Sequence, residues 1–125
     1  MYLLDTHTLL WYFDGDVRLS QDARIAIDGD YPLFVSIASF WEIAIKKSIG
    51  KLTCSYLLSE LDTYCRDARF SIIPITVEHL DLVSILPFIH RDPFDRLLIA
   101  QAKVENYTII THDEIIPAYP VETLW

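Results

Sequence analysis

The chain has 125 residues, of which 52% are hydrophobic and 13% aromatic, so it can form one packed domain and is too apolar for intrinsic disorder. Its net charge of −8 argues against a basic nucleic-acid-binding module, because phosphate neutralisation normally requires clustered Lys and Arg. The longest apolar stretch, residues 33–45, contains Glu42 and is too short to span a bilayer. With no visible signal peptide, we expect a soluble, cytoplasmic protein that forms a single domain over residues 1–125.

Short apolar strands alternate with amphipathic helices in the first half of the chain. Residues 2–4 predict a buried strand, and residues 6–13 predict a helix that ends before the turn at Gly15. Ser20 is a suitable N-cap for a second helix, which ends near Gly29. Residues 33–35 predict a second buried strand, and residues 38–49 predict a helix that stops at Gly50.

The second half continues this alternation. Residues 55–70 predict an amphipathic helix, and residues 71–75 predict a strand whose end is marked by Pro74. Thr76 caps a helix that reaches about residue 85, and Asp92-Pro93 opens a helix that reaches about residue 105. Residues 107–111 predict a fourth strand, and residues 121–124 predict a short edge strand. The pattern specifies an α/β fold in which α-helices flank a central parallel β-sheet.

Four acidic residues lie where a strand should end or a helix should begin, namely Asp5, Glu42, Asp95 and Asp113. The carboxyl ends of parallel strands share one edge of the sheet, where ligands bind. Three of the acids follow three different strands and should meet there, whereas spacing alone does not place Asp95 over the sheet. Gathered carboxylates repel one another unless a cation lies between them, and Mg²⁺ and Mn²⁺ prefer oxygen ligands. The sequence therefore predicts a metal-dependent enzyme.

Each acid also has an ordinary explanation in local structure. The four explanations are a helix N-cap for Asp5, a capping box of Ser39 with Glu42, a first-turn acid for Asp95 after the N-cap Asp92, and an Asx turn for Asp113. Capping and metal binding are compatible, because an acid in the first turn of such a helix directs its carboxylate outward from the strand edge.

Two other functions compete with a metal-dependent enzyme. A receiver-like phosphoacceptor domain is also an α/β fold with an acidic Mg²⁺ pocket, but it needs an Asp at the end of the third strand and a Lys after the fifth. Here the third strand ends at Ile75 without an Asp, and no Lys follows Thr111. A catalytically inert protein-binding α/β module would use the acids only as caps, and metal titration would separate it from an enzyme.

Four segments form an ordered set along the chain: Leu4-Asp5-Thr6-His7 with Leu9-Leu10-Trp11, the run from Ser36 to Lys46, the run from His90 to Ala102, and Thr111-His112-Asp113. In this order they resemble the PIN-domain ribonucleases, and the likeness is closest to the VapC toxins of bacterial type II toxin–antitoxin systems. The resemblance covers essentially the whole chain. Its strongest member is the run His90-Arg91-Asp92-Pro93-Phe94-Asp95-Arg96.

The resemblance implies a PIN-like domain whose catalytic and metal-binding residues are Asp5, Glu42, Asp95 and Asp113, called the carboxylate cluster below. These residues would hold one or two Mg²⁺ or Mn²⁺ ions. The resemblance also selects Asp95 over Asp92 as a ligand, which leaves Asp92 as the N-cap, and it makes Glu114 a less favoured substitute in the fourth motif.

Residues next to the four acids would support them. We expect the hydroxyls of Thr6, Ser39 and Thr111 to hydrogen-bond a ligand carboxylate or a water, as groups around a metal site commonly do. Arg96 is expected to offset charge in the carboxylate cluster or, as an alternative, to contact a phosphate. Further candidates are phosphate contacts from Lys46, Lys47 and Lys51, and orienting or surface roles for His7, His90 and His112.

The function implied is that of an Mg²⁺- or Mn²⁺-dependent endoribonuclease acting as a toxin. It would hydrolyse phosphodiester bonds in selected structured RNAs with a metal-activated water. Its expected partners are the RNA substrate and an antitoxin with a basic segment, which the net charge of −8 would attract. The resemblance also suggests a homodimer.

Overall fold

A computed structural model describes residues 1–125, which form one five-stranded sheet surrounded by six α-helices. The strands are β1 (Tyr2–Leu4), β2 (Leu33–Ser36), β3 (Phe70–Ile73), β4 (Thr108–Ile110) and β5 (Thr123–Leu124). The helices are α1 (Thr6–Asp14), α2 (Gln21–Asp28), α3 (Ile37–Ser48), α4 (Leu58–Asp67), α5 (Val77–Ile85) and α6 (Pro93–Glu105), with a 3-10 turn η1 at Ile116–Ala118.

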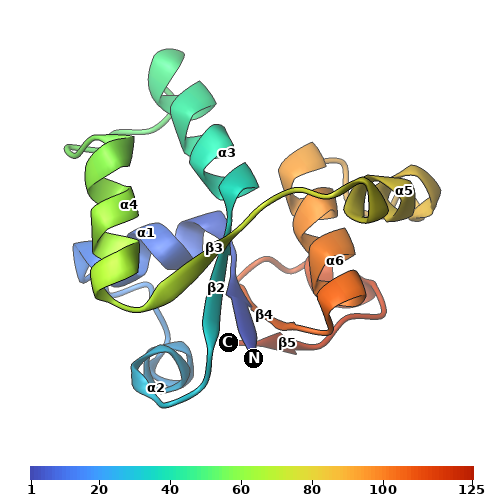
Figure 1. The fold of residues 1–125 in the computed structure, drawn as a ribbon, viewed down its shortest axis with the longest axis horizontal. Coiled ribbons are helices and arrows are strands. Elements are labelled where there is room, and N and C mark those ends of the chain that lie inside the picture. Colours follow the sequence, from blue (N-terminus) through green and yellow to red (C-terminus); the bar gives the residue numbers. More distant parts are fainter.

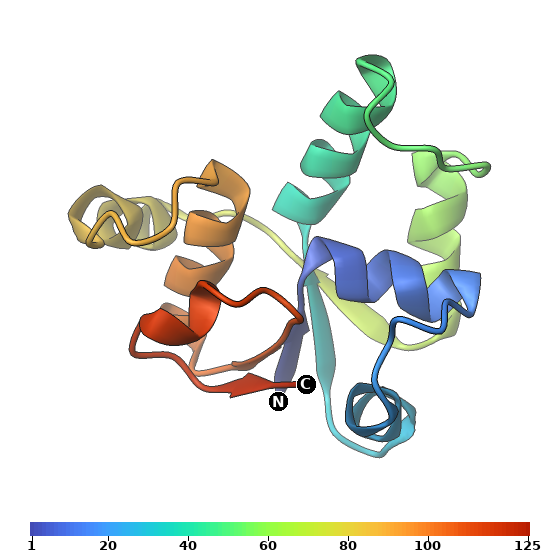
Figure 2. The ribbon, with the colours of Figure 1, turned by 180° about the vertical axis from the view of Figure 1, so that it is seen from behind.

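The sheet is entirely parallel, with the strand order β3-β2-β1-β4-β5. The chain therefore moves from β1 to β2 to β3 in one direction and then crosses back over the sheet to β4. Because such crossovers are right-handed, reversing their direction puts their helices on the opposite face. Accordingly, α1, α2 and α4 lie on one side of the strands and α5 and α6 on the other (Figures 1 and 2). The predicted α/β fold with a central parallel sheet is confirmed.

Each face of the sheet has its own hydrophobic core. Leu4 and Val35 point to the face where they pack with residues of α1 to α4, such as Ile43 and Leu61. Leu3 points the other way and packs with residues of α6, η1 and the segment after it. Neighbouring Leu3 and Leu4 are both 0% exposed, since side chains alternate along a strand and helices cover both faces. This burial explains why the strands are continuous apolar runs.

Several helix ends follow the predicted signals, and two boundaries differ from them. The side chains of Ser20 and Thr76 accept amide hydrogens as N-caps, as expected. Helix α4 ends at Asp67, before the predicted residue 70, because Arg69 has a left-handed φ of 63° that turns the chain directly into β3. The N-cap of α3 is Ser36, whose hydroxyl accepts from the Ala38 amide, so the predicted capping box of Ser39 with Glu42 is wrong.

None of the helices combines the length and the apolarity that crossing a membrane requires. Met1 precedes β1 at the amino end of the strands, whereas Trp125 follows β5 at their carboxyl end.

The side chain of Arg96 holds the segment between α5 and α6 in place. It is buried and donates hydrogen bonds to the carbonyls of Val83, Leu86 and Pro87 at 2.8–3.2 Å, and to the Tyr119 hydroxyl at 3.3 Å. The expectation that Arg96 offsets charge in the carboxylate cluster is therefore wrong. Adjacent residues on a helix point about 100° apart, so Arg96 turns toward α5 while its neighbour Asp95 faces a different side of α6.

We expect Arg96→Met to lower the free energy of unfolding by about 3 kcal/mol, because it leaves several buried carbonyl oxygens without donors. Urea denaturation measures this change. The matched control is Arg91→Met at an exposed position, which should change stability by no more than about 0.5 kcal/mol. Equal stability of the two variants would contradict the bracing role of Arg96.

Candidate metal centre

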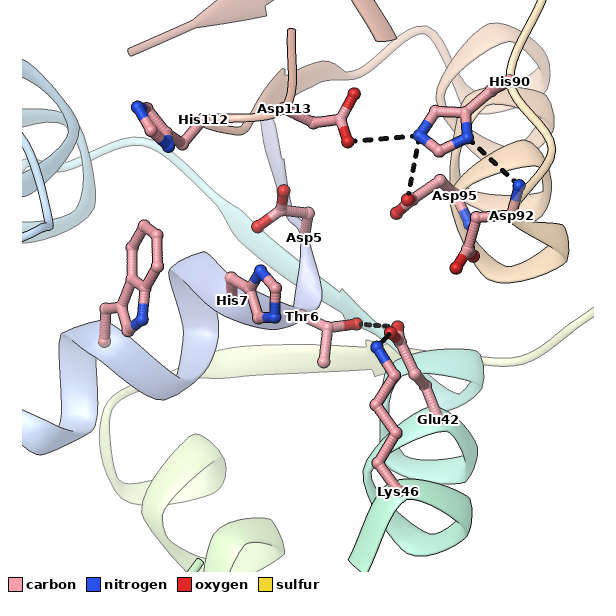
Figure 3. A pocket seen from close by; sticks show the side chains of 11 residues that line it. Asp5, Thr6, His7, Glu42, Lys46, His90, Asp92, Asp95, His112 and Asp113 are labelled. Carbon is pink, nitrogen blue, oxygen red and sulfur yellow. Dashed lines mark hydrogen bonds and ion pairs between the residues drawn. The ribbon is translucent and has the colours of Figure 1, made fainter. Parts of the chain in front are cut away.

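The carboxylate cluster lies at the carboxyl edge of the sheet, between the adjacent strands β1 and β4. The connections leave these two strands toward opposite faces, and ligands of open α/β sheets bind at such a switch point. A cavity of about 400 Å³ opens there, and Figure 3 shows the side chains that line it. The lining residues are Asp5, Thr6, His7, Trp11, Glu42, Lys46, His90, Asp92, Asp95, His112 and Asp113.

Asp5 follows β1 and serves as the N-cap of α1. Its Oδ1 accepts from the Thr8 amide at 2.8 Å, and its Oδ2 accepts a short hydrogen bond from the Thr111 hydroxyl. The side chain is buried, with 6% of the residue exposed. Burial raises the pKa of Asp5 above its ordinary value, although hydrogen bonds from Thr111 and Thr8 oppose the rise. The capping explanation is confirmed, and the same carboxylate also lines the cavity.

Glu42 lies on α3 and caps no helix. Its Oε1 accepts from the Thr6 hydroxyl at 2.6 Å, and the Thr6 and Ser39 hydroxyls are 3.0 Å apart and bonded to each other. The other oxygen, Oε2, is paired with the Lys46 ammonium group. Glu42 is 5% exposed, so burial and three neighbours from two helices fix its orientation (Figure 3).

Lys46 is the one lysine among the lining residues, and its ammonium group faces carboxylates. Burial works against its charge, but the ion pair with Glu42 and the nearby Asp92 and Asp95 outweigh burial and raise the pKa of Lys46. Lys47 instead donates to the Tyr56 carbonyl at 2.7 Å, outside the cavity. Of the lysines proposed as phosphate contacts, only Lys46 is thus placed at the cavity.

Asp113 follows β4 and closes the predicted Asx turn. Its Oδ1 accepts from the amides of Ile115 and Ile116 at 2.7 and 2.9 Å, and its Oδ2 faces the cavity and lies 3.1 Å from His90 Nε2. Burial works to raise the pKa of Asp113, but these hydrogen bonds outweigh it and lower the pKa. Its neighbour Glu114 is exposed and does not line the cavity.

Asp95 is held by fewer contacts than the other acids. It lies in the first turn of α6, where the adjacent N-cap is Asp92, whose Oδ1 accepts from the amides of Phe94 and Asp95. Its carboxylate has one close cationic or donor partner, His90 Nε2 at 3.1 Å. Burial and then the charges of Asp92, Asp5, Glu42 and Asp113 raise the pKa of Asp95 to about 8.

His90 joins Asp95 to Asp113. Its Nδ1 accepts from the Asp92 amide at 3.1 Å, so the ring hydrogen of the neutral imidazole is on Nε2, which lies 3.1 Å from both carboxylates. The ring is 7% exposed and therefore buried, and it orients the two acids (Figure 3). The sequence pattern did not reveal this bridge, because Asp113 belongs to a different element from His90 and Asp95.

This donor set suits a hard divalent cation. The four carboxylates of the cluster and that of Asp92 line one cavity with a single ammonium group among them, which leaves an excess of negative charge. Oxygen-rich sets of this kind favour Mg²⁺ or Mn²⁺ over softer metals. Ligand atoms of His90, Asp95 and Asp113 lie within 4.8 Å of one another, close enough to share one ion. Because Nε2 of His90 carries the ring hydrogen, we assign the ligand role to the carboxylates.

Comparison with known proteins gives one family and several related folds. The family model of the PIN domain matches residues 2–122. No curated protein sequence is significantly similar to the chain. A toxin–antitoxin complex from Klebsiella pneumoniae has a similar structure, with a TM-score of 0.68 and 19% identity, covering 100% of this chain and 97% of that one.

Two further structures are similar over nearly their full length. VapBC2 from Rickettsia felis, bound to a DNA fragment from their promoter, gives a TM-score of 0.73 and 16% identity, covering 99% of this chain and 98% of that one. FitAcB from Neisseria gonorrhoeae gives a TM-score of 0.71 and 16% identity, covering 100% and 97%. At these low sequence identities, the similarity shows a shared fold and nothing more.

We expect Asp95→Asn to stabilise the metal-free protein at pH 8 by about 2 kcal/mol, because the change removes a carboxylate that burial and four like charges disfavour. Since the pKa of Asp95 is raised from 3.8 to about 8, the folded protein holds this proton more tightly than the unfolded chain. Wild-type stability should therefore fall as pH rises between these values. Thermal melting of metal-free protein across this range measures both effects.

The matched control is Asp81→Asn, at an exposed position of α5 away from the cavity. It should change stability by no more than about 0.5 kcal/mol and leave the pH dependence as in wild type. A metal-free Asp95→Asn protein that melts well below wild type would show that Asp95 stabilises the fold and would contradict the electrostatic account.

Proposed function

This chain belongs to the PIN domain family, and from that premise we propose that it is an Mg²⁺- or Mn²⁺-dependent endoribonuclease, the toxin of a type II toxin–antitoxin pair. PIN domains are generally metal-dependent nucleases. The observation that carries the proposal is that Asp5, Glu42, Asp95 and Asp113 line one cavity. The single ammonium group among the lining residues does not balance their negative charge. A receiver-like domain is excluded by the family, and an inert binding module would need no such concentration of charge.

These four residues would hold one or two divalent ions. When bound, such an ion supplies Lewis-acid stabilisation of the phosphate charge and lowers the pKa of water so that hydroxide is available near neutral pH. The chain itself supplies fixed carboxylate orientations, through Thr111 for Asp5 and Thr6 for Glu42. His90 keeps Asp95 and Asp113 adjacent. Lys46 brings the one ammonium group to the cavity, where a phosphate oxygen could accept its hydrogen bonds.

The substrate proposed is an unpaired loop within a structured RNA. A protein of net charge −8 gains little from non-specific attraction to phosphates, so fit to a splayed loop must contribute to affinity. Consequently, activity on generic single-stranded RNA at physiological salt should be low, and a few sites should dominate.

The partner proposed is an antitoxin with a basic segment. The similar structures include a toxin–antitoxin complex, which supports this class of partner. An Arg or Lys of the segment would enter the carboxylate cluster and replace the positive charge of the metal. We place the protein in the cytoplasm with its RNA and antitoxin.

We also propose a homodimer. Large apolar side chains are exposed along α5 and just after it, namely Val77, Leu80, Ile85 and Phe88. Exposed apolar side chains gathered on one element suit burial against another surface, here a second copy of the chain.

Asp95→Asn is expected to reduce Mn²⁺-dependent RNA cleavage by more than about 100-fold, because even losing an outer partner of a metal ligand costs about 10- to 100-fold. Sequencing the 5′ ends created in cells after brief expression measures the effect and identifies the sites. Asp81→Asn, at an exposed position of α5, is the matched control and should cut like wild type. Cuts scattered over most transcripts would refute selectivity, and no cuts above the Asp95→Asn background would refute the ribonuclease assignment.

A peptide from the basic segment of the antitoxin should compete with Mn²⁺ for the carboxylate cluster. At an Mn²⁺ concentration about 100 times its dissociation constant, the apparent affinity of the peptide should fall about 100-fold. Isothermal titration with and without Mn²⁺ measures this affinity. In the control, NaCl free of divalent cations replaces Mn²⁺ at equal ionic strength, which separates competition from salt screening. Unchanged affinity would mean that the partner binds elsewhere.

A further inference from the structure

One wall of the same cavity is aromatic. His7 stacks on Trp11 with ring centroids 5.5 Å apart and an interplanar angle of 14°. His112 lies 6.0 Å from Trp11 and 5.1 Å from Trp125, and the two tryptophans are 5.8 Å apart. We call these four residues the aromatic platform. They come from α1, from the segment after β4 and from the end of the chain, so they meet only in the folded protein.

The platform has a supporting layer and an exposed layer. Trp11 and Trp125 are partly buried and pack against the core beneath α1, whereas both imidazoles are exposed. His7, His112 and Trp11 also line the cavity that contains the carboxylate cluster. Figure 3 shows His7 and His112 on one side of Asp5, and His90 with Asp92 on the other. The imidazoles are therefore placed for a ligand that also reaches the acids.

We propose that His7 and His112 stack with unpaired nucleobases of an RNA whose backbone phosphate lies at the carboxylate cluster. This inference rests on the proposed ribonuclease function and adds the residues that select its substrate. Aromatic rings bind single-stranded RNA by stacking, which does not require positive charge on the protein. An acidic protein needs such a source of affinity, because its net charge of −8 repels phosphates.

A basic protein segment suits the platform less well. Arginine side chains prefer the face of Trp among aromatic rings. On this platform the Trp11 ring is already covered by the chain's own Arg18, whose guanidinium carbon is 4.8 Å from the ring centroid and which is held by Asp16. The two exposed rings of the platform are the flat imidazoles of His7 and His112, which favours a planar nucleobase.

The platform would select loops over helices in RNA. A base inside a duplex is already stacked on its neighbours and cannot reach His7 or His112, whereas a loop base can be splayed out. Stacking discriminates weakly between bases. The choice of cleavage site would thus depend on which loop brings a phosphate to the carboxylates and a free base to the platform together.

The test combines substitutions in the protein with removal of bases from the RNA. The probes are a dye-labelled oligoadenylate of about ten nucleotides and an abasic ribose-phosphate oligomer of the same length, with binding measured by fluorescence anisotropy in Ca²⁺. Replacing both imidazoles, His7→Ala with His112→Ala, should weaken binding of the oligoadenylate about tenfold or more. Binding of the abasic oligomer should change less than about twofold, since bases and rings interact only when both are present.

Two further measurements distinguish a loss of stacking from damage to the fold or to the carboxylate cluster. His7→Phe with His112→Phe keeps the flat rings and should restore most of the oligoadenylate affinity. The melting-temperature increase caused by Mn²⁺ should be the same in all variants, which reports a folded protein and an intact carboxylate cluster.

If the double Ala variant lost affinity equally for both oligomers, or for neither, the stacking role of the platform would be refuted. The ribonuclease proposal would then still stand. A wild-type protein that responds to Mn²⁺ but neither binds nor cuts RNA would overturn the ribonuclease proposal and the platform with it. If the Ala variant instead lost affinity only for a basic peptide, the surface would belong to a protein partner, and the nucleobase assignment would be wrong.

Discussion

Repulsion between carboxylates at the junction of β1 and β4 is the constraint on which the rest of this site depends. The four acids of the carboxylate cluster and Asp92 line one cavity, and the chain offers Lys46 as the only ammonium group among the lining residues. Burial, and then the negative charge of the surrounding carboxylates, raises the pKa of Asp95 to about 8. Keeping such a group costs stability, and strongly shifted pKa values of this kind cluster at functional sites.

The neighbours of each acid explain how the four carboxylates stay close together despite their mutual repulsion. Asp5 and Asp113 are held by backbone amides of a helix start and a turn, and Glu42 is held by Thr6 and Lys46. Because these bonds come from the chain itself, the carboxylates are held in place before any ligand arrives. Helix capping and the proposed metal binding would therefore be two uses of the same geometry, which fits the small size of the domain.

The failures of local prediction have a common cause. Ser39 and Glu42 match a capping box in sequence, but α3 begins directly after β2 with Ser36 as its cap, so Glu42 is free to face the cavity. Arg96 adjoins Asp95 in sequence, yet the helix turns it toward α5 and Tyr119. In both cases the residue type was informative, and the direction of the side chain depended on where the helix started and what it packed against.

The sequence by itself determined the alternation of strands and helices, the parallel sheet, and the arrival of three acids at one edge, because periodicity, caps and strand ends are short-range features. Only the tertiary structure decided that Asp95 joins them, since this depends on the crossover that carries α6 to the opposite face. The bridge through His90 and the aromatic platform were likewise decided by packing. His7 and Trp11 are one turn apart on α1, but no local pattern links them to His112 and Trp125, whose contacts with Trp11 exist only once β1, β4 and β5 lie in one sheet.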